Sequence, residues 1–219
     1  MVRRKFPWVK YTEGPNEGFS KGNNRARPMV TGDMVLFLNP DTIVHKDVFA
    51  KTVIFLKEHP NAGAVTCKLV LPNGKMDKDT RRRFPTPKIA FQHLILGNGK
   101  AYWYEDISEN ITHEVEAIQG AFFLTRKKVL DEVGWFDEKY FFDGEHLKGV
   151  TKGKVSEWKH KVSPKQRKKI RLAGVTSMER FFRKNLWKKY PLVFDYFVVF
   201  GIKVFKVFRY IKVALLSSY

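Results

Sequence analysis

The most informative stretch of the chain is Asp33-Met34-Val35-Leu36-Phe37-Leu38-Asn39-Pro40-Asp41. Its apolar run predicts a short buried strand, which ends at the Asn-Pro-Asp sequence. The strand would deliver the carboxylate of Asp41 to its C-terminal edge, where open α/β sheets bind their ligands. A hard oxygen ligand there suits Mg²⁺ or Mn²⁺ held between one carboxylate and substrate phosphates. An equally good explanation is that Asp41 caps a helix beginning after Thr42.

Strands and helices are predicted to alternate around this strand. Strands are predicted at 33–38, 64–71 and 115–124, and helices at 20–29, 45–58, 126–133 and 176–190. The second helix has apolar residues at helical spacing, and Gly134 is a typical signal for the end of the third. We expect residues 79–101 to be a basic, proline-containing connection. The alternation predicts an α/β fold with a mostly parallel sheet.

Charge divides the chain of 219 residues into two parts. The net charge is +19, but residues 1–143 hold 22 Lys and Arg against 18 Asp and Glu, whereas residues 144–219 hold 19 against 4. So basic a segment indicates a partner such as nucleic acid, an anionic membrane surface or a phosphorylated substrate. The single cysteine, Cys67, excludes an internal disulfide and a cysteine-based zinc site. We expect it to be a small buried residue in a reducing compartment.

A glycine-rich turn precedes the first predicted helix, in the segment Asn16-Glu17-Gly18-Phe19-Ser20-Lys21-Gly22-Asn23-Asn24-Arg25-Ala26. Backbone N–H groups at such a helix start favour an anion such as a diphosphate. Glycine at positions 18 and 22 permits close approach of a ligand to the backbone. A helix that is merely capped by this turn is the alternative interpretation.

A third segment combines small residues with clustered acids. Gly120 interrupts the strand predicted at 115–124, which marks a close approach by backbone or ligand. The carboxylates of Asp137, Glu138, Asp143 and Glu145 follow in an aromatic setting, which would raise a pKa and produce a general base. The alternative is a loop whose acids are all solvated.

In their order along the chain, these segments resemble the family 2 glycosyltransferases with the GT-A fold, in particular the rhamnosyltransferase-like members. The similarity extends over residues 13–190. The six matching elements are residues 16–26, 36–41 (ending Leu-Asn-Pro-Asp), 72–74 (Pro-Asn-Gly), 82–87 (Arg-Arg-Phe-Pro-Thr-Pro), 120–126 (beginning Gly-Ala-Phe) and 134–142 (beginning Gly-Trp-Phe-Asp-Glu). The resemblance implies inverting transfer of a sugar from a nucleotide-sugar donor to a glycan or lipid-linked acceptor, as in cell-surface polysaccharide synthesis.

The resemblance implies donor-binding roles for five residues. Asn16, Gly18 and Asn24 match the element that lines the nucleotide-sugar pocket. Asp41 matches the second acid of the family's metal-binding D-x-D-type signature, and Asn39 replaces the first. The implied cofactor is Mg²⁺ or Mn²⁺, which with cationic groups stabilises the departing diphosphate.

On the acceptor side, Gly120 and Ala121 match the strand that borders donor and acceptor. The family's catalytic base is an Asp that follows a Gly-Glu pair, but here Gly144-Glu145 leads directly into His146. Glu145 is therefore the candidate base, and His146 is either a late metal ligand or an accident of the junction. Compared with the family, the chain starts after the nucleotide-binding strands and has lost a segment near 145–146. We therefore expect little or no sugar transfer by this chain.

The C-terminal segment is apolar, aromatic and cationic. Residues 191–216 are interrupted by Lys203, Lys206, Arg209 and Lys212, which exclude a simple membrane-spanning helix. The pattern predicts an interfacial helix on anionic lipid, or alternatively an amphipathic helix packed against a core. Because no recognised DNA- or RNA-binding motif is present, nucleic acid is the weaker partner for the basic region.

These observations predict three parts: an incomplete GT-A domain at 1–145, a basic linker and helix at 146–190, and a membrane-interfacial helix at 191–219. Residues 148–171 within the second part are expected to form a mobile linker or an exposed helix. The basic N-terminus lacks a following apolar segment, so we expect a cytoplasmic protein at the inner face of the cell membrane. The rival hypotheses are a non-catalytic remnant that binds a membrane or partner, and a nucleic-acid-binding protein.

Overall fold

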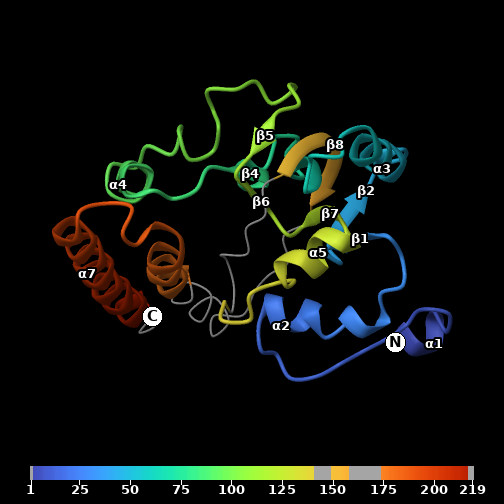
Figure 1. Ribbon diagram of the computed structural model, residues 1–219, viewed down its shortest axis with the longest axis horizontal. Coiled ribbons are helices and arrows are strands. Elements are labelled where there is room, and N and C mark those ends of the chain that lie inside the picture. Colours follow the sequence, from blue (N-terminus) through green and yellow to red (C-terminus); the bar gives the residue numbers. More distant parts are fainter. Residues whose placement is uncertain (1, 141–148, 158–173, 217–219) are drawn as a thin grey trace.

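The computed structural model describes residues 2–140, 149–157 and 174–216, which form a sheet with helices around it (Figure 1). The strands are β1 (Met34–Leu38), β2 (Thr42–Val44), β3 (Ala64–Val70), β4 (Arg81–Arg82), β5 (Glu114–Val115), β6 (Ala117–Ile118), β7 (Phe122–Arg126) and β8 (Gly149–Glu157). The α-helices are α1 (Val2–Lys5), α2 (Phe19–Asn24), α3 (Val48–Glu58), α4 (Pro87–Leu94), α5 (Lys127–Val133) and α7 (Leu192–Leu216). Shorter turns of 3-10 helix are η1 (Arg27–Met29) and η2 (Lys78–Thr80), and η3 (Phe182–Leu186) is a π-helix.

The main sheet follows the order β1-β7-β3-β8-β2, and β5 pairs with β8. The prediction of a mostly parallel sheet is not confirmed, because β3 and β8 are the one parallel pair among the described strands. The strand–helix–strand unit β1-α3-β3 does have its two strands in the same direction, since both are antiparallel to β7. What the alternating pattern could not predict is that β7 lies between them.

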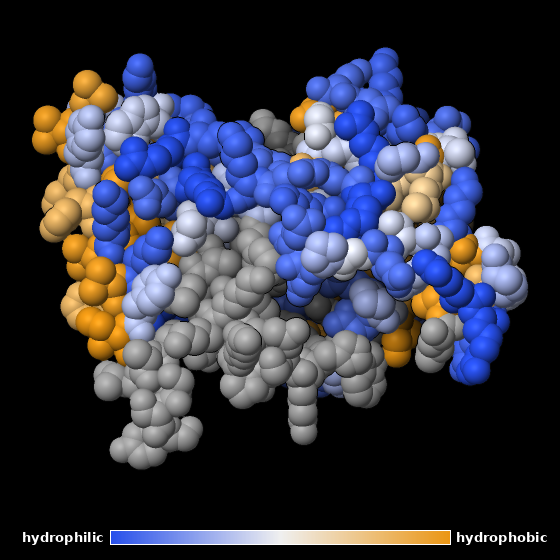
Figure 2. Space-filling view, turned by 90° about the horizontal axis from the view of Figure 1, so that it is seen from below, coloured by the Kyte–Doolittle hydropathy of each residue, from blue (hydrophilic) through white to orange (hydrophobic). Residues whose placement is uncertain are grey.

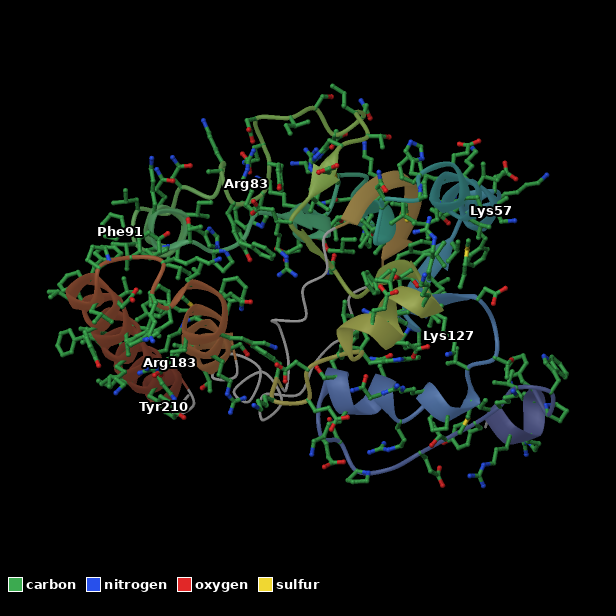
Figure 3. All side chains as sticks on the ribbon, viewed as in Figure 1. Lys57, Arg83, Phe91, Lys127, Arg183 and Tyr210 are labelled. Atoms are coloured by element: carbon green, nitrogen blue, oxygen red, sulfur yellow. The ribbon has the colours of Figure 1, made fainter. Side chains whose placement is uncertain are left out.

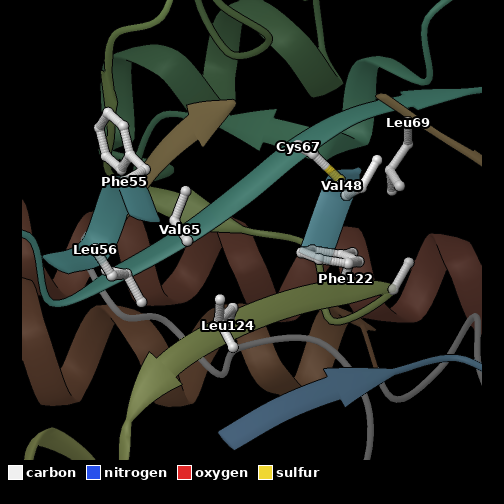
Figure 4. Close-up of a cluster of buried hydrophobic side chains, with 9 residues drawn as sticks. Val48, Phe55, Leu56, Val65, Cys67, Leu69, Phe122 and Leu124 are labelled. Carbon is white, nitrogen blue, oxygen red and sulfur yellow. The ribbon is translucent and has the colours of Figure 1, made fainter. Parts of the chain in front are cut away.

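Side chains alternate across β7, so this strand contributes to two cores. On one face, Phe122 and Leu124 pack with α3 and β3 in a buried cluster (Figure 4). On the other face, Phe123 packs with Leu130 of α5 and with β1. Cys67 lies in the first cluster and is fully buried, as predicted, and burial raises the pKa of its thiol above the usual range. The β1–β7 pair, at one end of the sheet, is therefore packed against a hydrophobic core on each face.

The predicted helices and strands near β1 are largely confirmed, with differences that have local causes. The helix expected at 20–29 is interrupted, since α2 ends at Asn24 and a 3-10 turn with Pro28 near its start follows. The helix α4 lies where only a connection was predicted, and it begins with Pro87 after Thr86, whose side chain accepts a hydrogen bond from the backbone N–H of Ile89. Thr-Pro is a good helix start for two reasons. The proline ring fixes φ near the helical value, and proline lacks the backbone N–H that would have no partner in the first turn.

The expectation of a linker or exposed helix at 148–171 is wrong for its described part. Residues Gly149–Glu157 form β8, which pairs with β3 and β2 through its backbone. The sequence of this stretch is basic and has few apolar residues, so composition alone does not predict the strand. The rest of that stretch lies outside the described residues.

The C-terminal helices form a separate packed unit beside α4 (Figure 1). Residues 174–181 are helical and continue into η3, and Phe181, Phe182 and Leu186 pack with Val199 of α7. The fully buried Asp195 fixes the corner before α7, because its carboxylate accepts a hydrogen bond from the Lys188 backbone N–H at 2.9 Å. Among the described residues, no helix combines the length and hydropathy needed to cross a membrane.

Candidate functional site

The C-terminal end of β1 forms the centre of the candidate site. The backbone N–H of Asn39 donates to the carbonyl of Ala121 at 3.0 Å, which continues the β1–β7 pairing past Leu38. Thr42 then closes a turn, because its backbone N–H and hydroxyl both donate to the carbonyl of Asn39, at 3.2 and 2.6 Å. The alternative that Asp41 caps a helix is wrong, since Thr42–Val44 is a strand and α3 begins only at Val48.

Two oxygen atoms near this end are buried and have no hydrogen-bond partner among the described residues. They are Oδ1 of Asp41, just after β1, and Oε1 of Gln119, just before the small residues that lead into β7. A buried polar atom with no hydrogen bond costs free energy, and in native proteins it generally marks a ligand, a water molecule or a strained site. Both atoms therefore suit an external group that supplies a positive charge or a hydrogen-bond donor.

A divalent metal fits this arrangement if the substrate completes its coordination. The described residues contain no group of three His, Cys, Asp or Glu side chains that could hold a metal by themselves. Mg²⁺, however, is usually held by one or two carboxylates together with substrate phosphates and water. The unpaired carboxylate oxygen of Asp41 is suited to be the one charged protein ligand of such a site. Asn39 lies two residues before it and is partly exposed.

Gly120 and Ala121 lie beside this end of β1, but both are in contact with other residues of the chain. A Cβ added at Gly120 would lie 2.6 Å from the Phe19 ring, so glycine is needed there for the start of α2 to pack on the strand. Ala121 is fully buried in the core. The strand thus brings α2 against the end of β1, and Gly120 also lines a neighbouring cavity described below.

The glycine-rich turn holds α2 in this position. The backbone N–H of Gly18 donates to the Asn16 side-chain oxygen at 3.3 Å, and Gly18 has a φ of 109°, a conformation that favours glycine. Lys21 and Arg25 both pair with Glu17, at 2.8 and 3.2 Å, and the hydrogen bond and charge of Lys21 lower the pKa of that carboxyl. Anion binding by this turn stays a prediction.

Asn24 connects α2 to the loop after α5. Its amide nitrogen donates to the carbonyl of Phe136 at 2.9 Å and to the carboxylate of Glu138 at 3.0 Å, while its oxygen accepts from the Phe136 backbone N–H at 3.2 Å. The rings of Phe19 and Phe136 also pack edge to face, 5.4 Å apart. The structure therefore gives Asn24 a positioning role between two of the sequence elements.

Replacing Asn24 with Ala is expected to lower the free energy of unfolding by about 1–3 kcal/mol, because two groups of the Phe136 backbone lose their partner. Asn23 is the matched control, since its amide bonds only the carbonyl of Phe19 in the same helix. Urea denaturation of both variants measures the difference. An equal loss for Asn23→Ala and Asn24→Ala would contradict the positioning role.

A cavity of about 360 Å³ lies between this loop and the C-terminal helices. Aromatic rings form much of its wall, including Phe84, Trp135, Phe136, Tyr140 and Phe181, and the polar lining residues are Asp137, Lys184 and Asn185. Such a mixture of ring faces and hydrogen-bonding groups suits a sugar, which offers both apolar faces and hydroxyl groups.

Asp137, which lines this cavity, does not have the raised pKa that the aromatic setting suggested. Burial acts to raise the pKa of Asp137, but hydrogen bonds from Lys184 and from the Lys139 backbone lower it overall. Lys184 lies 2.6 Å from that carboxylate, and Glu138 accepts the bond from Asn24. Asp143, the candidate base Glu145 and His146 all lie outside the described residues.

Two residues at the site were not singled out from the sequence. Gln119 was visible only as the neighbour of a glycine in a strand, and its buried oxygen depends on the β1–β7 register. Lys184 lies 47 residues from Asp137, and nothing in its helical surroundings distinguishes it from other lysines there. Only the packing of the C-terminal unit brings it to the cavity.

A family model described as "Glycosyltransferase like family 2" matches residues 4–151 of the 219. The match includes α2, the end of β1, β7 and the loop after α5, which together form the candidate site. No curated protein matches the chain.

Proposed function

Because the chain belongs to glycosyltransferase-like family 2, we propose that it transfers a sugar from a nucleotide-sugar donor to a glycan or lipid-linked acceptor with inversion. The family implies a transferase with an α/β fold of the GT-A type. The observation that supports this proposal best is the buried, unpaired Oδ1 of Asp41 at the end of β1, among the elements that the family match includes. We further propose rhamnosyltransferase-like chemistry in cell-surface polysaccharide synthesis.

In this proposal Asp41, with Asn39 beside it, holds a Mg²⁺ or Mn²⁺ ion against the donor diphosphate. The ion supplies positive charge that stabilises the departing nucleoside diphosphate. Asn16 and Gly18 contact the donor through the turn before α2, and Asn24 keeps that helix against the Phe136 loop. Gly120 and Ala121 shape the side toward the acceptor. Glu145 removes the proton of the acceptor hydroxyl.

We also propose that the protein acts at the cytoplasmic face of the membrane, bound peripherally through α7. This helix carries large apolar side chains that are exposed, including Val193 at 83% and Phe200 at 65%. Hydrophobic side chains gather along the side of the molecule where α7 lies (Figure 2). Lys203, Lys206 and Arg209 add positive charge to the same helix, which suits an anionic lipid surface.

Donor turnover tests the proposed activity. The chain is incubated with a panel of nucleotide-sugars and a lipid-extract acceptor, with Mn²⁺ or with a chelator, and the released nucleoside diphosphate is measured. We expect metal-dependent release that is little above background, because His146 follows Glu145 where the family has its Asp base. Any release should fall further in Glu145→Gln, since a general base contributes about 10²–10⁴-fold. Glu138→Gln is the control acid, because Glu138 precedes Glu145 by seven residues in the sequence and accepts a hydrogen bond from Asn24.

Complete absence of donor release, together with normal vesicle binding, would support the rival hypothesis of a non-catalytic remnant. The small number of carboxylates at the described site is the observation that favours this rival. Steeply salt-dependent binding to oligonucleotides without vesicle binding would instead favour a nucleic-acid partner.

A further inference from the structure

An apolar groove of about 550 Å³ lies between α4 and α7, apart from the candidate site. Its walls are Pro85, Pro87, Lys88, Ala90, Phe91, Leu94 and Ile95 on one side and Phe194, Phe197, Val198, Gly201, Ile202 and Phe205 on the other, with Met178 and Phe182 between. Lys88 is the one charged residue among the described residues that line it. Figure 3 shows Phe91 on α4 and Tyr210 on α7 at the end of the molecule away from Lys57 and Lys127.

The groove has the size and lining of a ligand site. Its volume is in the range of small-molecule pockets, which are mostly apolar with a few polar groups. Phe91 and Ile95 are 55% and 60% exposed at its edge, and Phe197 is 71% exposed on the facing helix. Soluble proteins rarely leave contiguous apolar surface of this kind uncovered unless it binds something.

The charges around the groove indicate the head group of its ligand. Lys88 is exposed at the wall and forms no ion pair within the described part of the chain. The guanidinium of Arg209 lies 5.6 Å from the centre of the Phe205 ring, which is itself a wall residue. Among the described residues, no acidic side chain lines the groove. An apolar channel bordered by cations complements a hydrocarbon chain that ends in an anion.

We propose that this groove binds the hydrocarbon chain of a phosphate-bearing lipid, with Lys88 and Arg209 attracting the phosphate. The inference rests on the proposed function, since it specifies the lipid of a lipid-linked acceptor as the occupant. It differs from binding of α7 to a membrane surface, because the groove takes a single chain between two helices, whereas the outward face of α7 contacts many lipids.

A larger side chain substituted for Gly201 would fill the groove without disturbing its walls. A Cβ added there has open space, with no atom within 4 Å, and the residue lines the groove near the middle of α7. Leucine is also a better helix former than glycine. Gly174 is a matched control, because it too is helical with open space around an added Cβ but does not line the groove.

The test is calorimetric titration of the full chain with decyl phosphate below its micelle concentration. We expect saturable binding, weakened at least about tenfold by Gly201→Leu, because even one methylene in an apolar pocket changes affinity about 10–200-fold. Gly174→Leu should bind as the unmodified chain does. Lys88→Ala should weaken decyl phosphate binding by a smaller factor, and inorganic phosphate alone should not bind measurably. Circular dichroism and melting temperature check that each variant is folded.

Equal binding of decyl phosphate by the unmodified chain and by folded Gly201→Leu would overturn the proposal. So would a dimer in sedimentation that Gly201→Leu dissociates while decyl phosphate binds neither form, since a second copy would then cover the groove. Donor release without decyl phosphate binding overturns the groove proposal alone. Decyl phosphate binding without donor release supports the groove and counts against sugar transfer.

Discussion

Asp41→Ala is expected to weaken metal-dependent binding of a nucleoside diphosphate by at least about 100-fold. Loss of a group that merely orients a metal ligand typically costs about 10–100-fold in affinity, and Asp41 is proposed to be the ligand itself. Its Oδ1 is buried and unpaired in the described structure, so no other side chain already neutralises it. Without metal, the variant and the unmodified chain should bind the nucleotide equally weakly.

The measurement is titration of nucleoside diphosphate by calorimetry, with and without Mn²⁺. Asp33→Ala is the matched control, because Asp33 precedes the same strand and is exposed, and its hydrogen bond to Lys127 uses only the backbone carbonyl. The stability of Asp41→Ala should not fall, since the substitution removes a buried carboxylate oxygen, Oδ1, that has no partner among the described residues. Unchanged metal-dependent binding in Asp41→Ala would show that the metal is held elsewhere.

The parts of the fold that were predictable are those specified by local sequence. The apolar run of β1 and the helical spacing in α3 are local patterns, so they can be recognised without knowing which segments pack against them. The end of α5 was predictable for the same reason, because Gly134 adopts a φ of 89° that other residues disfavour. The carboxylate of Asp41 at the end of β1 followed directly from these assignments.

The features that sequence analysis missed depend on contacts between distant segments. The insertion of β7 between β1 and β3 is set by pairing across 84–92 residues to β1 and 59–61 residues to β3, and no local pattern encodes it. The role of Asn24 likewise depends on Phe136, 112 residues away. The strand β8 is likewise defined by its pairing with β2 and β3, which its basic and polar sequence does not predict. The elements that form the candidate site were thus predicted, but the contacts between them were not predicted.

Serine at Val193, Phe200 and Val207 is expected to reduce binding of the chain to anionic vesicles by at least about 100-fold. These residues recur every seven positions along α7, so they form one stripe of the helix, and they are 83%, 65% and 57% exposed. Fully burying one such side chain in an apolar phase contributes about 1.5–3 kcal/mol, so even partial burial of three exceeds the roughly 2.7 kcal/mol that 100-fold requires. None of the three lines the groove between α4 and α7.

Substitution on this stripe is a sharper test than deletion of residues 191–219. Deletion would also remove the buried Val199 and Asp195, which pack with or fix the preceding helices, so lost binding could reflect unfolding. Serine at three exposed isoleucines elsewhere, Ile43, Ile54 and Ile111, is the matched control and should leave sedimentation with vesicles unchanged. Added salt should weaken binding of the unmodified chain, because the cations of α7 contribute through screened attraction. If the Val193, Phe200 and Val207 variant and the isoleucine variant sediment with vesicles equally well, α7 is not the membrane contact.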